Sequence, residues 1–129
     1  MKKLLLTVLF TLSCINICNA ESISGISPNM TTANIINEYG NMRNYPGIAW
    51  FHGDKVMIIE LSKGTLDSSK LNINNNIQDY INFYGPKYNR VSTKNETLYQ
   101  WSLNNNTEIL NVYMIHNDIT SVVLEAVHK

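Results

Sequence analysis

Cysteine is almost absent from the chain, because its 129 residues include only Cys14 and Cys18. The remaining 129 − 20 = 109 residues, from 21 onward, carry no thiol. This excludes disulfides and thiolate chemistry from that part. After residue 20 no apolar run approaches the roughly 20 residues that a membrane-spanning helix needs. We therefore expect one small domain, stabilised by its hydrophobic core and not inserted in a membrane.

Clusters of positive charge are missing as well. The chain has ten Lys and Arg and ten Asp and Glu, and all ten acids follow residue 20. Because Lys2 and Lys3 precede that point, segment 21–129 has a formal net charge of 8 − 10 = −2. Its cations are scattered singly from Arg43 to Lys129. This pattern argues against a protein that binds nucleic acid by neutralising phosphates.

Enzyme motifs are also lacking. The sequence has no Gly-x-Ser-x-Gly nucleophile elbow and no glycine-rich phosphate loop, and its carboxylates follow no spacing motif. We expect no catalytic residues, no metal and no cofactor. One alternative stays open, because His52 and His116 each stand close to an aspartate in a predicted turn. If the two turns met, the histidines would suit a small hydrolase or a zinc site.

The first twenty residues have the order of a secretory signal. Two lysines near the start precede an apolar run over 4–12, and Cys18-Asn19-Ala20 places small residues where signal peptidase reads the chain. We predict that residues 1–20 are a signal peptide and that the mature protein, 21–129, is periplasmic or secreted. Lipid attachment at Cys14 is the alternative, although Thr11 stands where a lipid-attachment box usually has an aliphatic residue.

An internal repeat is the most informative feature. Segment 36–40 reads Ile-Asn-Glu-Tyr-Gly and segment 81–85 reads Ile-Asn-Phe-Tyr-Gly, at an offset of 81 − 36 = 45 residues. Apolar residues at spacings of three and four precede each glycine, and glycine closes helices. The pattern predicts helices that end at Tyr39 and Tyr84.

Three strand-like segments follow each predicted helix. They cover 48–52, 56–61 and 65–71 in the first half and 98–103, 109–115 and 119–126 in the second. Alternating apolar residues indicate half-buried strands, and the short turns between them indicate antiparallel hairpins. We predict an α+β fold of two tandem helix–β–β–β units, about 26–71 and 72–126. Together they would form an antiparallel sheet with both helices packed on one face.

This order of elements resembles the beta-lactamase-inhibitor-protein-like fold, whose units also occur in small outer-membrane assembly lipoproteins. The run Asn29-Met30-Thr31 before Gly40, and the pair Gly85-Pro86, are similar to the start of such units. The resemblance covers residues 26–126 and implies a binding module outside the cytoplasm. It departs from the family in having one helix per unit instead of two, and no functional residue can be carried over.

Aromatic residues are the candidate contacts with a partner. Trp50 and Trp101 hold equivalent places in the repeats, and Tyr45 and Tyr88 lie in the loops 41–47 and 86–95. Both types suit core packing as well as a protein interface. We predict a module that binds another protein through these four residues, with an exposed sheet face or the two loops as the binding surface. Inhibitor, immunity protein and envelope-accessory protein are the candidate roles. A small-ligand carrier, with a cup under the helices, is the second alternative.

Overall fold

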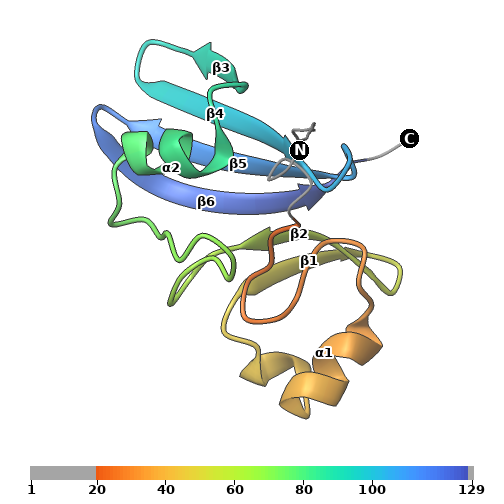
Figure 1. Ribbon diagram of the computed structural model, residues 1–129. Coiled ribbons are helices and arrows are strands. Elements are labelled where there is room, and N and C mark those ends of the chain that lie inside the picture. Colours follow the sequence, from red (N-terminus) through yellow and green to blue (C-terminus); the bar gives the residue numbers. More distant parts are fainter. Residues whose placement is uncertain (1–19, 128–129) are drawn as a thin grey trace, which may run out of the picture.

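Six strands form one antiparallel sheet in the computed structural model, which describes residues 20–127 (Figure 1). The predicted signal peptide up to residue 19, with Cys14, lies outside the described residues. The strands are β1 (Ile48–His52), β2 (Lys55–Glu60), β3 (Asn89–Ser92), β4 (Glu96–Leu103), β5 (Glu108–Ile115) and β6 (Asp118–Ala126). The helices are α1 (Thr32–Tyr39), α2 (Ile77–Tyr84) and the short 3-10 helix η2 (Met42–Asn44). The predicted α+β class and antiparallel sheet are confirmed.

Strand β6 lies in the interior of the sheet, whose spatial order is β1-β2-β6-β5-β4-β3. Ile59 of β2 pairs with Leu124 of β6, and Leu124 pairs on its other side with Leu110 of β5. The hairpin β1–β2 is therefore attached to the other strands only through β6, the last strand of the described chain. Figure 1 shows this division, with the hairpin and α1 below and the other strands and α2 above.

The order of elements differs from the predicted pair of helix–β–β–β units. The predicted strand over 65–71 is wrong, because residues 67–69 form a turn and Leu66 makes only an isolated bridge to Ile23. The polar run Asp67-Ser68-Ser69 binds the segment that begins at Glu21 and does not pair along a strand. Conversely, β3 lies in a predicted loop. Two strands follow α1 and four follow α2.

Both predicted helix ends are confirmed at Tyr39 and Tyr84. Gly40 has φ 85° and Gly85 has φ 101°, conformations that a side chain would strain. Each glycine N–H donates to the carbonyl four residues earlier, which satisfies one free acceptor at the helix end. The repeated Tyr-Gly pair is thus a helix stop.

The start of α2 is fixed by asparagine. The Asn76 side chain accepts a hydrogen bond of 3.0 Å from the Asp79 amide, and the Asp79 carboxylate accepts one of 3.3 Å from the Asn76 amide. We expect Asn76→Ala to lower the free energy of unfolding by about 1 kcal/mol, since it removes this cap. Urea denaturation measures the loss. Asn74→Ala is the matched control because Asn74 is exposed, and an equal loss in both variants would contradict the capping role.

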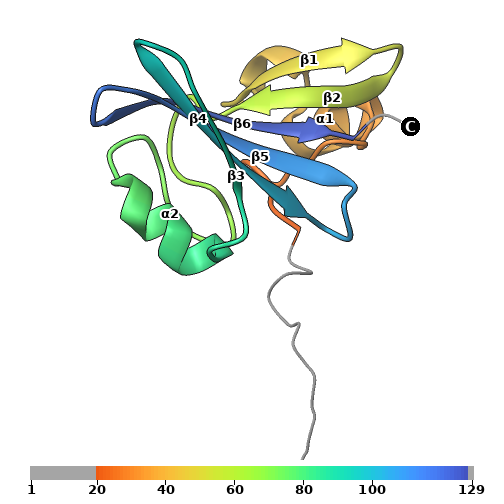
Figure 2. The same ribbon diagram turned by 90° about the horizontal axis from the view of Figure 1, so that it is seen from above.

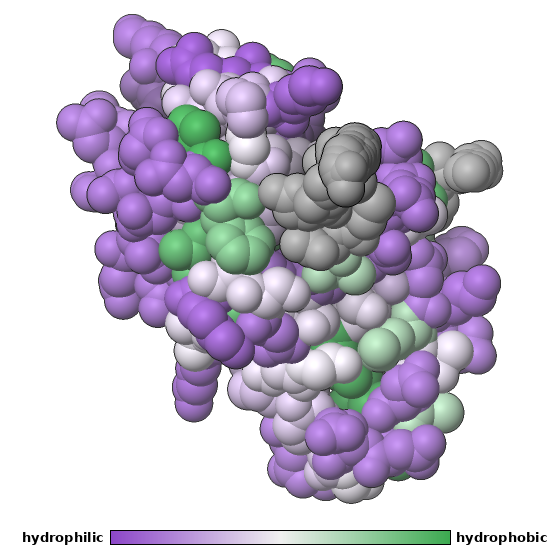
Figure 3. All heavy atoms as spheres, in the orientation of Figure 1, coloured by the Kyte–Doolittle hydropathy of each residue, from purple (hydrophilic) through white to green (hydrophobic). Residues whose placement is uncertain are grey.

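One hydrophobic cluster joins both helices to the sheet. Ile35 of α1 and Tyr80 of α2 are both fully buried in it. They share it with a row of residues that pair across neighbouring strands, namely Ile59, Leu124, Leu110 and Trp101. On the side that carries α2, hydrophilic residues cover most of the surface and hydrophobic residues show as small patches (Figure 3). The core is therefore on the helix side of the sheet.

Candidate functional site

Trp101, one of the four predicted contact residues, lies in the core. It is 2% exposed and its ring packs against Tyr80, Tyr84 and Tyr88 at centroid distances of 5.4–6.4 Å. Its indole N–H donates a hydrogen bond of 2.9 Å to the carbonyl of Gly85. Trp101 therefore fastens the end of α2 to the sheet and offers no surface to a partner.

The two predicted tyrosines also face inward. Tyr45 is 7% exposed, and its hydroxyl donates a hydrogen bond of 2.7 Å to the carbonyl of Ile23. Tyr88 is half-buried and its ring lies 5.1 Å from that of Tyr99. Both tyrosines act as packing residues of the loops that carry them.

Trp50 alone of the four lies at the surface, with 47% of its area exposed. It occupies the same place in β1 that Trp101 has in β4, yet the two rings lie on opposite faces of the sheet. Ala49 pairs with the core residue Ile59 and packs against the core, so the next residue of β1, Trp50, points to the other face of the sheet. The sequence repeat therefore does not predict burial at this position.

The sheet face opposite the core is formed by the alternate residues of each strand. Ile59 and Leu124 point into the core, so their strand neighbours, such as Ile58 and Glu125, point the other way. Figure 2 looks onto this side of the β1–β2 hairpin, with α1 behind it. We call it the open face. A hollow of about 350 Å³ on it is lined by Trp50, Ile58, Glu60, Asn111, Tyr113, Val123 and Glu125.

Polar side chains are held rigidly at the floor of this hollow. Asn111, only 1% exposed, accepts a hydrogen bond of 2.8 Å from the side-chain amide of Gln100. Its own amide donates one of 2.8 Å to the Glu125 carboxylate. Ser121 donates one of 3.1 Å to the Glu60 carboxylate. Each carboxylate is thereby fixed in place by one neutral donor, with other lone pairs left to accept a ligand's hydrogen bonds.

The field in the hollow is negative. Among the described residues that line it are two glutamates and no cationic side chain. Burial raises the pKa of Tyr113 above its ordinary value, and the carboxylates of Glu125, Glu96 and Glu60 raise it further. A tyrosine surrounded by three carboxylates resists loss of its proton because a phenolate would add a like charge. The arrangement favours a positively charged ligand next to aromatic rings.

The two histidines lie far apart. His116 is in the β5–β6 turn, whereas His52 pairs with Lys55 at the β1–β2 turn. Because β2 runs antiparallel to β6 with Ile58 opposite Glu125, the two turns are at opposite ends of the sheet. Their separation is on the order of 30 Å, from about ten residues at ~3.3 Å each. The histidines therefore cannot share a metal or an acid–base reaction, and residues 20–127 hold no group of three metal-binding side chains.

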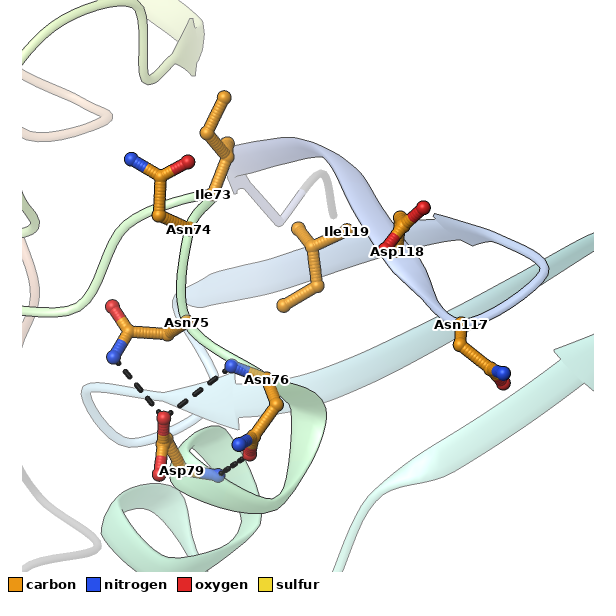
Figure 4. A pocket seen from close by; sticks show the side chains of 8 residues that line it. All are labelled: Ile73, Asn74, Asn75, Asn76, Asp79, Asn117, Asp118 and Ile119. Carbon is orange, nitrogen blue, oxygen red and sulfur yellow. Dashed lines mark hydrogen bonds between the residues drawn. The ribbon is translucent and has the colours of Figure 1, made fainter.

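A second hollow lies between the asparagine run before α2 and the β5–β6 turn (Figure 4). Asp79 and Asp118 are its acidic lining residues, and Asp79 accepts hydrogen bonds from the Asn75 side chain and the Asn76 amide, at 3.1 and 3.3 Å. These contacts cap α2, so Asp79 and the two asparagines beside it stabilise the start of the helix. As the turn-forming tendency of asparagine predicts, this run acts in turns and caps.

Comparison with protein-family models, with curated proteins and with solved structures found no match to this chain. The resemblance to the beta-lactamase-inhibitor-protein-like fold therefore stays a prediction. Within residues 20–127, neither α-helix has the length and apolar character required to cross a membrane.

Proposed function

We propose that this protein is an exported binding module, without catalysis, that holds a basic segment of another protein on the open face. The observation that carries the proposal is the exposed Trp50 beside the fixed carboxylates of Glu60 and Glu125. An inhibitor, an immunity protein or an envelope accessory would each use such a surface.

The chemistry of the hollow suits a lysine or arginine side chain flanked by apolar residues. Trp50 and Tyr113 supply aromatic faces, each of which attracts a cation by about 0.5–1 kcal/mol when exposed to solvent and by about 2 kcal/mol when water is excluded. The two glutamates add charge-assisted hydrogen bonds. Tryptophan is a frequent anchor of protein interfaces. The exposed Ile48 at the start of β1 extends the apolar contact.

A duplicated origin is part of the same proposal. The shared Tyr-Gly helix ends, and the place of Trp50 and Trp101 in strands that begin hairpins, support two related halves. The second half would then have gained β3, while the first lost its third strand to the turn at residues 67–69.

A photo-cross-linking amino acid at Val123, inside the hollow, tests the proposed contact in the organism's own envelope. We expect it to capture a partner whose cross-linked peptide contains Lys or Arg. Trp50→Ala should weaken the isolated complex about 10–100-fold, and the double change of Glu60 and Glu125 to Gln about tenfold. Binding should weaken with salt, because exposed charges are screened.

Two controls match these changes. The same cross-linker at Gln78, exposed on α2, should not capture that partner, and Glu38→Gln on α1 removes an exposed charge away from the open face. A captured peptide without a cation, or full affinity in a folded Trp50→Ala protein, would rule out the proposed contact.

A further inference from the structure

Glu21 is almost completely enclosed, with 1% of its area exposed. Its carboxylate accepts hydrogen bonds from the amides of Ser68 and Ser69, at 2.7 and 3.2 Å, and from the Tyr84 hydroxyl at 2.6 Å. The residue before it, Ala20, is exposed. The chain thus becomes part of the core at the residue that follows the predicted signal peptide.

The main-chain nitrogen of Glu21 points to a second buried acid. It lies 3.4 Å from Oε1 of Glu108, whose side chain is 2% exposed. Burial raises the pKa of Glu108, and the Glu21 carboxylate adds to that rise, while hydrogen bonds from the Glu21 backbone and Asn104 oppose it. Within residues 20–127, every hydrogen-bond donor that the structure gives these two carboxylates is neutral. A pair of buried acids without a cation is costly.

We propose that cleavage of the Ala20–Glu21 bond creates the missing cation, and that Glu108 captures the new α-ammonium group of Glu21 as a buried ion pair. The inference rests on the export proposed above. A signal peptidase and water break the peptide C–N bond. The hydroxyl of water goes to the carbonyl carbon of Ala20, and the nitrogen of Glu21 takes the hydrogen and one further proton from solvent.

The product fits the site chemically. An α-amino group has a pKa of about 7.7–8.0, so it is mostly charged at neutral pH. An ammonium group donates a shorter and stronger hydrogen bond to a carboxylate than an amide does. Among the described residues, cleavage gives up one hydrogen bond on the other side of the bond, that of 3.2 Å from the Ser68 hydroxyl to the Ala20 carbonyl. Replacing a neutral donor by a cation therefore favours the docked state.

The segment after Glu21 is held by the repeated tyrosines. Tyr39 donates its hydroxyl to the Ser24 carbonyl, and Tyr84, its equivalent in α2, donates to the Glu21 carboxylate. Both halves of the fold thus contact the new N-terminus. Because a peptidase needs an accessible bond, and Glu21 is enclosed here, cleavage precedes docking of this segment. The matured end then joins the two halves.

The test begins with the chain produced by export and processed in the envelope. Mass spectrometry should find Glu21 as the first residue, and any other first residue overturns the processing site. In the folded protein the α-amine should react with an acylating reagent at least tenfold more slowly than the same amine in urea. An amine that reacts equally fast in both states overturns the capture, and this measurement needs no substitution.

A double-mutant cycle isolates the ion pair. One exported variant carries an extra serine between Ala20 and Glu21, which moves the amine one residue away from Glu108. In the processed wild type, Glu108→Gln should reduce the folding equilibrium constant about a hundredfold. In the serine variant the same change should reduce the folding equilibrium constant less than tenfold. Equal effects in both backgrounds would overturn the capture, while partner binding through Trp50 stays a separate measurement.

Discussion

Replacing Trp101 with alanine is expected to lower the free energy of unfolding by about 3–5 kcal/mol, whereas Trp50→Ala should change it by less than about 0.5 kcal/mol. The two residues have equivalent places in the sequence repeat, so the difference comes only from burial, which leaves 2% of Trp101 and 47% of Trp50 exposed. The Trp101 change leaves a cavity among the surrounding tyrosine rings and removes the donor to the Gly85 carbonyl.

Urea denaturation of both variants measures the contrast. Trp101→Phe is the matched control, because it keeps an aromatic ring in the core and removes mainly the hydrogen bond and part of the volume. We expect it to lose about half as much stability or less. Similar losses in Trp50→Ala and Trp101→Ala would show that the sheet faces are assigned incorrectly.

Raising the pH above about 10 is expected to unfold the protein steeply. Burial raises the pKa of Tyr45, Tyr80 and Tyr84 far above the ordinary value of 10. For Tyr84 the Glu21 carboxylate adds to this rise. Below pH 10 the three hydroxyls are protonated in both the folded and the unfolded chain. Their contribution to the free energy of unfolding is therefore fully present there and does not change with pH. Above that pH the unfolded chain releases protons that the folded chain keeps, and stability falls as pH rises.

The size of the effect follows from the number of groups. Each such tyrosine contributes about 1.4 kcal/mol per pH unit, so three give about 4 kcal/mol per unit. A domain with about 5–15 kcal/mol of stability is then lost within a few pH units. Urea denaturation at a series of pH values, with tyrosinate absorbance, measures the slope. Tyr84→Phe should reduce the slope by about a third, and ordinary titration of all three tyrosines in the folded protein would contradict the prediction.

The sequence predicted the fold well where periodicity and helix stops agree. Both helix ends and five of the six strands lie where alternation and the Tyr-Gly pairs place them. The failure at 65–71 has a local cause, because Asp67 and the serines beside it bind the N-terminal segment, a long-range contact that no local pattern indicates. Strand β3 was missed because its exposed residues, Asn-Arg-Val-Ser, lack an apolar face.

The candidate site was predicted less well. Of the four aromatic residues only Trp50 reached the surface, because a tryptophan or tyrosine suits a core and an interface equally. The carboxylates of the open face were missed, although a signal existed. If Leu110, Val112 and Leu124 face the core, then Asn111 and Glu125 must face the other way, and two polar residues inside apolar strands indicate a special surface.

The position of β6 between β2 and β5 determines the order in which the strands of the sheet can pair. Because a protein chain is synthesised from its N-terminus, β1 and β2 are present before β6, and until β6 is added the inner edge of β2 has no neighbouring strand. Ile59 of β2 pairs with Leu124 of β6, which is 65 positions later in the chain. Formation of the complete sheet therefore depends on a pairing between distant segments, which is slow. The exposed hairpin edge during this delay is open to pairing with other chains, and a helper that shields it would raise the yield of folded protein.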